Sequence, residues 1–313
     1  MDYKKIIKSR ALRVRIMQIL SFVPDSWMLR LQYRIKTGHQ LDLKNPRRYT
    51  EKLQWYKLYY RDPLMAQCVD KYAVRTYVEQ CGLHDILNPI YGVYDVPEQV
   101  RWEELPDRFV AKDTLGGGGN DVIICRDKSK LNRERFYAEL SRWVTPVHGK
   151  HPGREWVYDN AKHRILIEKL IDSDPKEGGL IDYKFFCFNG KPEYLYVIAD
   201  RKLGQDAEMG IFSREFCKLP VQRVGERKLE RSVSKPINYE EMILCAEKLS
   251  GSFPHARVDL YNQDGKIIFG EITFFNASGY MMFDPDEFDL SMGDKFILPK
   301  EKYKMVSQNG LIL

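Results

Sequence analysis

Hydrophobic and polar residues alternate in several short runs along the chain, and turn-forming residues bound each run. Alternation with a period of two predicts β-strands, because successive side chains of a strand point to opposite faces. Two pairs of runs flank the turn sequences Asn189-Gly190 and Asn262–Lys266 and therefore predict β-hairpins. The expected strands are 90–94, 109–112, 122–125, 164–170, 183–188, 193–199, 257–261 and 267–271.

Helical periodicity occupies much of the remaining sequence. Residues 3–37 are predicted to be helical, with a break at Pro24-Asp25. The further expected helices are 51–60, 69–82, 131–143 and 238–249, the last opened by a capping box of Asn238 and Glu241. Strand pairs mixed with helices indicate an α+β protein with antiparallel sheets rather than a continuous βαβ series.

Composition places the chain among globular proteins. It has 313 residues, of which 43% are hydrophobic, enough for about two domains. No uncharged run approaches the roughly 18 apolar residues of a membrane-spanning helix. The six cysteines are widely spaced, so neither a zinc site nor a redox pair is indicated, and we expect free thiols in a reducing cytoplasm.

Positive charge is concentrated at the N-terminus. Residues 1–50 contain 12 Lys and Arg against three Asp, a balance of +9, whereas the whole chain carries only +6. Residues 51–313 therefore sum to −3, which disfavours nucleic acid as the main partner because a reading face would need basic residues throughout. The basic segment suits contact with an anionic membrane surface or polysaccharide, or it forms an ordinary helix pair with a solvated basic face.

A glycine-rich loop follows a predicted strand that contains Lys112. Gly116, Gly117, Gly118 and Gly119 lack side chains, so their backbone N–H groups could approach a phosphate. The loop has neither the P-loop pattern nor the dinucleotide fingerprint. A flexible hairpin tip explains the four glycines equally well.

Charged residues also occur on other buried-strand patterns. Glu168 and Lys169 end the run 165–171, either as an exit to solvent or as part of an adenine pocket. Arg257, Asp259, Glu271 and Thr273 share one face of the last hairpin, with Asp259 roughly opposite Glu271. Two facing carboxylates indicate a Mg²⁺ site or, alternatively, a solvated face with an Arg–acid pair.

Together these segments resemble the ATP-grasp fold, specifically the TupA-like ATP-grasp family of capsule and teichuronopeptide gene clusters. The stretches that carry the resemblance are 51–63, 70–75, 108–120, 165–171, 182–201 and 257–280. The resemblance implies two α+β subdomains that grip ATP, preceded by a helical basic extension. The expected division is a basic N-terminal region at 1–62, the N-terminal part of the core at 63–107, a lid with the glycine-rich loop at 108–170 and a C-terminal subdomain with the metal site at 171–313.

The resemblance also implies roles for individual residues. Arg257 and Lys112 would be catalytic, with Arg257 steadying the transferred phosphoryl group. Asp259 and Glu271 would bind Mg²⁺, with Thr273 at a position where related ligases commonly have Asn. The residues expected to contact ATP are Lys71, Lys112, Gly116, Gly117, Gly118, Gly119, Glu168, Lys169, Leu170, Asp182 and Lys184, and those expected at the acceptor substrate are Arg201, Asn276 and Ser278.

The implied reaction is ATP- and Mg²⁺-dependent ligation of a carboxylate to an amine through an acyl-phosphate. The closer family adds an acceptor class, a uronic acid of a bacterial surface polysaccharide or its precursor. Glycosyl transfer in polysaccharide synthesis and phosphoryl transfer to a sugar are the alternatives. The expected location is the cytoplasm, with peripheral contact to the inner face of the membrane through the basic N-terminus.

Overall fold

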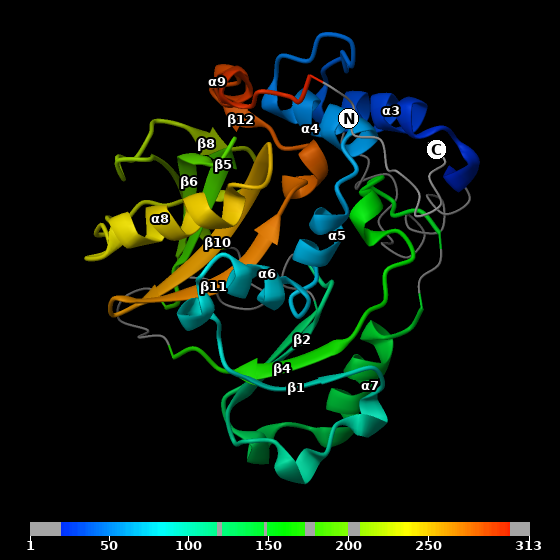
Figure 1. The fold of residues 1–313 in the computed structure, drawn as a ribbon, viewed down its shortest axis with the longest axis vertical. Coiled ribbons are helices and arrows are strands. Elements are labelled where there is room, and N and C mark those ends of the chain that lie inside the picture. The colour runs from blue at the N-terminus through cyan, green and yellow to red at the C-terminus, as the bar shows by residue number, and fades with distance from the viewer. Residues whose placement is uncertain (1–19, 118–120, 147–148, 173–178, 200–206, 301–313) are drawn as a thin grey trace.

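The computed structural model describes residues 20–117, 121–146, 149–172, 179–199 and 207–300. A four-stranded and a six-stranded sheet lie toward different ends of the molecule, with short helices between them (Figure 1). The expected α+β class with antiparallel sheets is confirmed by this arrangement. Among the described residues, no helix is long and apolar enough to cross a membrane.

The smaller sheet has four strands in the order β1-β4-β2-β3. They are β1 (Ile90–Tyr94), β4 (Ile165–Lys169), β2 (Phe109–Asp113) and β3 (Val122–Cys125), all paired antiparallel. Helix α7 (Arg133–Trp143) covers one face, where Phe136 packs edge-on against Phe109 of β2. Asn132 caps this helix by accepting a hydrogen bond from the backbone N–H of Arg135.

The larger sheet has six strands in the order β11-β10-β5-β6-β7-β9. Four strands form two hairpins, β5 (Asp182–Phe188) with β6 (Lys191–Ala199) and β10 (His255–Gln263) with β11 (Lys266–Thr273). The other two are β7 (Glu208–Ser213) and the short β9 (Arg227–Lys228), which pair in parallel. A separate two-stranded ribbon joins β8 (Gln222–Arg223) to β12 (Phe283–Asp284).

The two faces of the larger sheet carry different helices (Figure 1). Helix α8 (Tyr239–Ser250) covers one face, where Tyr239 packs against Phe185. Helix α4 (Tyr49–Tyr59) lies on the other, and its buried Tyr49 contacts Phe186 edge-on and hydrogen-bonds to the His255 ring at 2.9 Å. Burial, helped by the charge of Arg257, lowers the pKa of His255 to about 3, so the ring is neutral in the core.

Four further helices surround this core. Helix α3 (Asp25–Thr37) lies at the periphery beside α4, and α9 (Glu287–Lys295) packs against α4. Helix α5 (Pro63–Val69) contacts β11 and leads into α6 (Val74–Gln80). The buried side chains of α4, α5 and α6 belong to the same hydrophobic core as the larger sheet. Helices α4, α5 and α6 therefore support the sheet on which the site is built.

Several local expectations need correction. The helix expected at 69–82 begins only at Val74 and ends at Gln80, because α5 ends at Val69 and Asp70 then turns the chain by accepting hydrogen bonds from the N–H groups of Tyr72 and Ala73. The Asn238 capping box is absent, since the Asn238 side-chain oxygen accepts a hydrogen bond from the Asn262 amide at 2.6 Å instead of from the helix backbone. The expected free thiols are confirmed for all six cysteines. The helix expected over 3–19 lies outside the described residues.

Candidate active site

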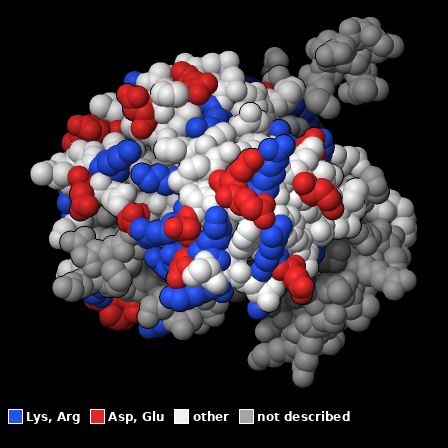
Figure 2. All heavy atoms as spheres, turned by 90° about the horizontal axis from the view of Figure 1, so that it is seen from below, with Lys and Arg blue, Asp and Glu red and all other residues white. Residues whose placement is uncertain are grey.

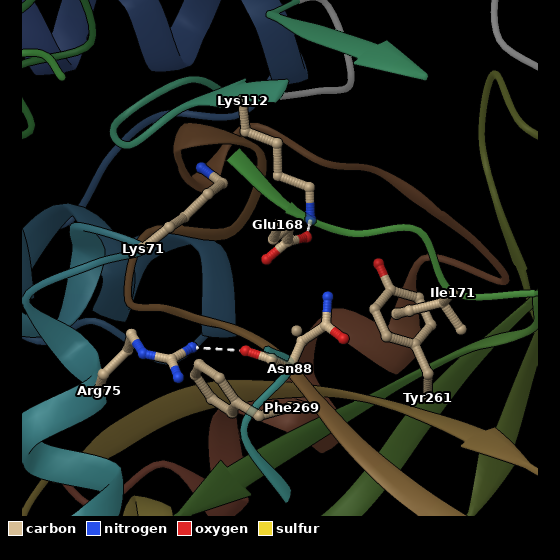
Figure 3. A pocket seen from close by; sticks show the side chains of 9 residues that line it. Lys71, Arg75, Asn88, Lys112, Glu168, Ile171, Tyr261 and Phe269 are labelled. Atoms are coloured by element: carbon tan, nitrogen blue, oxygen red, sulfur yellow. Dashed lines mark hydrogen bonds and ion pairs between the residues drawn. The ribbon is translucent and has the colours of Figure 1, made fainter. Parts of the chain in front are cut away.

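A pocket lies between the two sheets, where the hairpin β10–β11 faces β2 and β4 (Figure 3). Its wall combines cationic, acidic and aromatic side chains from both sheets and from the segments beside them. The lining residues are Lys71, Arg75, Asn88, Lys112, Glu168, Ile171, Tyr261, Phe269 and Gly270. Three of the residues predicted to contact ATP, Lys71, Lys112 and Glu168, are thus brought together in space.

Lys112 and Glu168 belong to adjacent strands. Val110 of β2 pairs with Glu168 of β4, so Lys112 lies two residues further along the same face and forms an ion pair with the Glu168 carboxylate. Both side chains are largely buried. Figure 3 shows the Lys112 and Lys71 side chains extending toward the same part of the pocket. The pocket wall therefore carries three cationic side chains, Lys71, Arg75 and Lys112, and one acid, Glu168, which is paired with Lys112.

Lys71 connects the turn between α5 and α6 to the start of the glycine-rich loop. Its ammonium group donates to the Gly116 carbonyl, and its backbone N–H donates to the Thr114 carbonyl at 2.9 Å. A side chain at Gly116 would approach the Asp121 Cβ to 2.8 Å, so this glycine is needed for the close packing of the loop. Gly117 is described and has open space around it, whereas Gly118 and Gly119 lie outside the described residues.

The backbone at Lys169 is already engaged in the smaller sheet. Strand β4 lies between β1 and β2, the Lys169 N–H donates to the Pro89 carbonyl at 2.9 Å, and its carbonyl accepts from the Asn88 amide at 2.8 Å. The sequence suggested that the backbone at Glu168 and Lys169 forms a free strand edge that could hydrogen-bond to a purine. These backbone groups are instead bonded within the smaller sheet. The chain leaves the sheet only after Lys169, where Leu170 is buried and Ile171 lines the pocket.

The carboxylate pair lies directly beside this pocket. Asp259 of β10 is the cross-strand partner of Glu271 of β11, and it also neighbours Lys184 of β5. The strand register shifts after Asp259, and Gly270 lies in this bulge with its Cβ position only 3.0 Å from the Asp259 carbonyl. The facing arrangement of Asp259 and Glu271 expected from the hairpin sequence agrees with the structure.

Arg257 holds the carboxylates in place. Its Nε and Nη2 atoms donate to the two carboxylate oxygens of Asp259 at 2.7 and 2.8 Å. Nη2 also donates to the Glu271 carboxylate at 3.0 Å and to the Thr273 hydroxyl at 3.1 Å. Nη1 donates to the Asn276 side-chain carbonyl, and the Lys184 ammonium forms a second ion pair with Asp259. Two cations and two carboxylates thus form one buried network.

The electrostatics of this network differ between the two acids. Burial would raise the pKa of Glu271, but the charges of Lys71, Lys184 and Arg257 outweigh it and lower the pKa to about 2. Burial raises the pKa of Asp259 against the opposing effects of Arg257 and Lys184. The Glu271 side chain is 37% exposed, whereas that of Asp259 is 3% exposed. Glu271 is therefore the more accessible member of the pair, and its lowered pKa keeps it ionised at neutral pH.

Three other predicted residues lie around this network. Asp182 is buried on β5, 3.7 Å from the Lys184 ammonium, and pairs across the sheet with Tyr261 of the pocket. Asn276 and Ser278 lie in the turn η8 (Asn276–Gly279), where Ala277 and Ser278 adopt positive φ angles. Arg201, the remaining predicted substrate residue, lies outside the described residues.

Sequence reasoning missed a fully buried lysine beneath this turn. Lys57 of α4 donates to the Gly153 carbonyl at 2.9 Å and to the Ser278 carbonyl at 2.7 Å. Burial lowers the pKa of Lys57 to about 7. The sequence offered one signal for this burial, because Lys57 lies one helical turn after Leu53 on the apolar face of the helix. Arg75, Asn88, Tyr261 and Phe269 of the pocket were also missed, because a lone residue in a turn or strand carries no motif.

The carboxylates of this network could hold a divalent cation only together with oxygen atoms of a bound phosphate. Among the described residues, no group of three or more His, Cys, Asp and Glu side chains could hold a metal ion. Mg²⁺ commonly uses one or two carboxylates together with phosphate oxygens and water. Asp259 and Glu271 fit that requirement, with the Thr273 hydroxyl beside Glu271.

Comparison with known proteins identifies the class. Residues 51–297 match the TupA-like ATPgrasp family, so the chain belongs to this family, and the expected ATP-grasp fold is confirmed. No curated protein matches the chain.

Solved structures with a similar fold include two D-alanine–D-alanine ligases. The ligase of Bacillus anthracis is 18% identical, with a TM-score of 0.39, and the aligned region covers 66% of this chain and 57% of the ligase. That of Helicobacter pylori is 16% identical, covers 80% of this chain and 68% of its own, and has a TM-score of 0.41. An L-amino acid ligase from Bacillus licheniformis is 15% identical over 69% of this chain and 42% of its own, with a TM-score of 0.40. The chain thus spans little more than half of the B. anthracis ligase.

Proposed function

We propose that this protein is an ATP- and Mg²⁺-dependent ligase that joins a carboxylate to an amine. The observation that carries the proposal is the pocket with Lys71, Lys112 and Glu168, which directly adjoins the Asp259–Glu271 pair. A pocket for a polyphosphate needs cations, and in-line transfer of its terminal phosphoryl group needs a metal beside it. Membership of the TupA-like ATP-grasp family supports the same chemistry.

The proposed reaction has two steps. A carboxylate oxygen of the substrate attacks the γ-phosphorus of ATP, the bond to the β-phosphate oxygen breaks, and ADP leaves. The amine then attacks the carbonyl carbon of the acyl-phosphate, inorganic phosphate leaves, and the amine nitrogen loses a proton. Both steps move negative charge on phosphate oxygens, so fixed cations can stabilise them without a protein nucleophile.

Each group has a proposed task. Lys71 and Lys112 bind phosphate oxygens, Gly116–Gly119 close over them, and Asp182 and Lys184 lie on the ribose side. We place the adenine hinge at Leu170 and Ile171, because the Lys169 backbone is already bonded. Asp259 and Glu271 would hold Mg²⁺, which neutralises phosphate charge when bound.

The remaining residues face the acceptor in this proposal. Arg257 keeps the carboxylates oriented and contributes positive charge at the transferred phosphoryl group. Asn276, Ser278 and Arg201 border the acceptor pocket. Asn276 is already held by Arg257, so the turn η8 and the metal site are positioned together.

The proposed acceptor is a uronic acid of a bacterial surface polysaccharide or its precursor, and the amine is an amino acid or another amine. This part rests on the resemblance to the TupA-like family. We also propose a cytoplasmic location, with peripheral contact to the inner face of the membrane through residues 1–50, which carry a balance of +9.

Product analysis tests the function. The full chain is incubated with ATP, Mg²⁺, uronic-acid glycans and a panel of amines, and nucleotides and glycans are separated by mass spectrometry. ADP together with an amide supports ligation. A phosphorylated sugar without amide would instead establish a phosphotransferase, and glycosyl transfer without ATP consumption would establish a glycosyltransferase.

A further inference from the structure

The outer face of helix α3 is unusually apolar for a surface. Four large hydrophobic side chains at its start and along it are exposed: Phe22 by 79%, Trp27 by 72%, Leu31 by 54% and Ile35 by 43%. Trp27, Leu31 and Ile35 follow one another at intervals of four residues and therefore share one face of the helix. The opposite face is packed into the fold through buried residues that include Leu29 and Tyr33. The packing of the described residues does not use the exposed face.

Arginines border this apolar stripe. Arg30 and Arg34 lie on the same outer side of α3 and, with Gln40 and Leu41, line a shallow hollow in the surface. The only acid of the helix, Asp25, is paired with Lys150 at 2.8 Å and lies 3.6 Å from Arg154. Arg30 and Arg34 donate to the uncharged carbonyls of Leu41 and Gly38, and the Asp42 carboxylate lies near Arg30 without an ion pair to it, so both arginines keep their charge. The α3 surface, defined as Phe22, Trp27, Arg30, Leu31, Arg34 and Ile35, thus combines apolar and cationic side chains.

The positive charge of the α3 surface distinguishes between the partners that could cover it. Residues 1–19, which precede it in the chain, contain six Lys and Arg and one Asp, so they have the same sign as Arg30 and Arg34. A second copy docked by the same face would bring the same arginines near one another. An anionic lipid surface matches both properties, because tryptophan and aliphatic residues enter the interface while arginines contact the headgroups.

The position of the α3 surface is also compatible with membrane binding, because a membrane on this end of the molecule would leave the active site accessible. Helix α3 is at the opposite end of the long axis from the smaller sheet (Figure 1). On the face seen from that other end, Lys and Arg are interspersed with Asp and Glu (Figure 2), as in a solvated surface. We infer that the α3 surface docks the protein on an anionic lipid bilayer. This inference deepens the peripheral contact proposed above by naming its residues, and its test measures lipid binding rather than ligation.

The test is co-sedimentation of the full chain with phosphatidylcholine vesicles that contain a quarter phosphatidylglycerol, against vesicles of phosphatidylcholine alone. The variant Trp27→Ser/Leu31→Ser/Ile35→Ser should weaken partitioning to the anionic vesicles by about tenfold or more. Arg30→Gln/Arg34→Gln should weaken it on anionic vesicles and make the remaining binding less sensitive to salt. The matched control Ile237→Ser/Leu244→Ser, which changes exposed apolar residues at and on α8, should bind like the wild type.

A second measurement does not depend on a multiple variant. Brominated lipids should quench part of the tryptophan fluorescence of the wild type, and this part should be lost in Trp27→Phe. Three results would overturn the inference: unchanged partitioning of the triple variant, loss of binding on deletion of 1–19 with the triple variant still bound, or a dimer-to-monomer change in the triple variant with unchanged lipid binding.

Discussion

Replacing Glu271 with Gln separates metal binding from structural support at the carboxylate pair. The Glu271 side chain is 37% exposed, and the structure gives it one hydrogen bond from Arg257, at 3.0 Å, and a marginal one from the Thr273 hydroxyl, at 3.5 Å. An ion pair this accessible contributes about 0–1 kcal/mol to the free energy of unfolding. The amide keeps the size of the side chain and can still accept from Arg257. The Tm should therefore change little.

The effect on ATP turnover should be much larger. An amide oxygen has no net charge to offer a Mg²⁺ bound between phosphates and protein. We expect turnover to fall by about 100-fold or more, equivalent to about 2.7 kcal/mol in the activation free energy. Raising the Mg²⁺ concentration should recover part of the loss, because the weakened step is metal binding.

The assay is ADP release measured by a coupled enzyme over a range of Mg²⁺ concentrations, with Tm determined in parallel. Glu208→Gln is the matched control, because Glu208 also pairs with an arginine, Arg227 at 3.2 Å, at the far side of the same sheet. A stable Glu271→Gln protein that retains more than about a tenth of wild-type turnover would refute the assignment of Glu271 to the metal.

Three further changes probe the surroundings. Asp259→Asn should cost about 3 kcal/mol of folding stability, measured by urea unfolding, because it removes the buried acid that Arg257 and Lys184 share and leaves them only Glu271 and the more distant Asp182; a loss below 1 kcal/mol would contradict the network. Gly270→Ala should lower ATP turnover more than stability, because a Cβ 3.0 Å from the Asp259 carbonyl displaces the bulge; unchanged turnover would show that the bulge can relax. Lys57, with its pKa lowered to about 7 by burial, is charged in the unfolded chain up to its ordinary value of 10.5. The wild type should therefore gain stability over Lys57→Met by about 1 kcal/mol per pH unit from pH 7.5 to 9, and a flat difference would mean that Lys57 stays protonated.

The hairpins were predictable because local signals agreed with one another. In β10 and β11 the alternation of buried and charged residues, together with the turn at Asp264-Gly265, fixes which side chains share a face and which residues lie opposite. Asp259 and Glu271 could thus be paired from sequence. The roles of Lys71 and Asp182 came only from the family resemblance, because neither residue stands in a pattern of its own.

What the sequence did not reveal depends on contacts between distant segments. The inner position of β4 follows from pairing with β1, which is more than 70 residues away, and nothing in the run 165–171 distinguishes an inner strand from an edge. Strand β7 (Glu208–Ser213) was missed because its four central residues are all buried, so no alternation of hydrophobic and polar residues marks it. The burial of Lys57 depends on the carbonyls of Gly153 and Ser278, which are distant in sequence and make its burial tolerable.

The central claim is that a carboxylate is phosphorylated before the amine attacks it. The most direct measurement uses a uronic-acid substrate labelled with ¹⁸O in its carboxyl group, incubated with the enzyme, ATP, Mg²⁺ and the amine. Transfer through an acyl-phosphate moves one ¹⁸O atom into the inorganic phosphate for each amide formed. Amide formation with unlabelled phosphate would contradict the account.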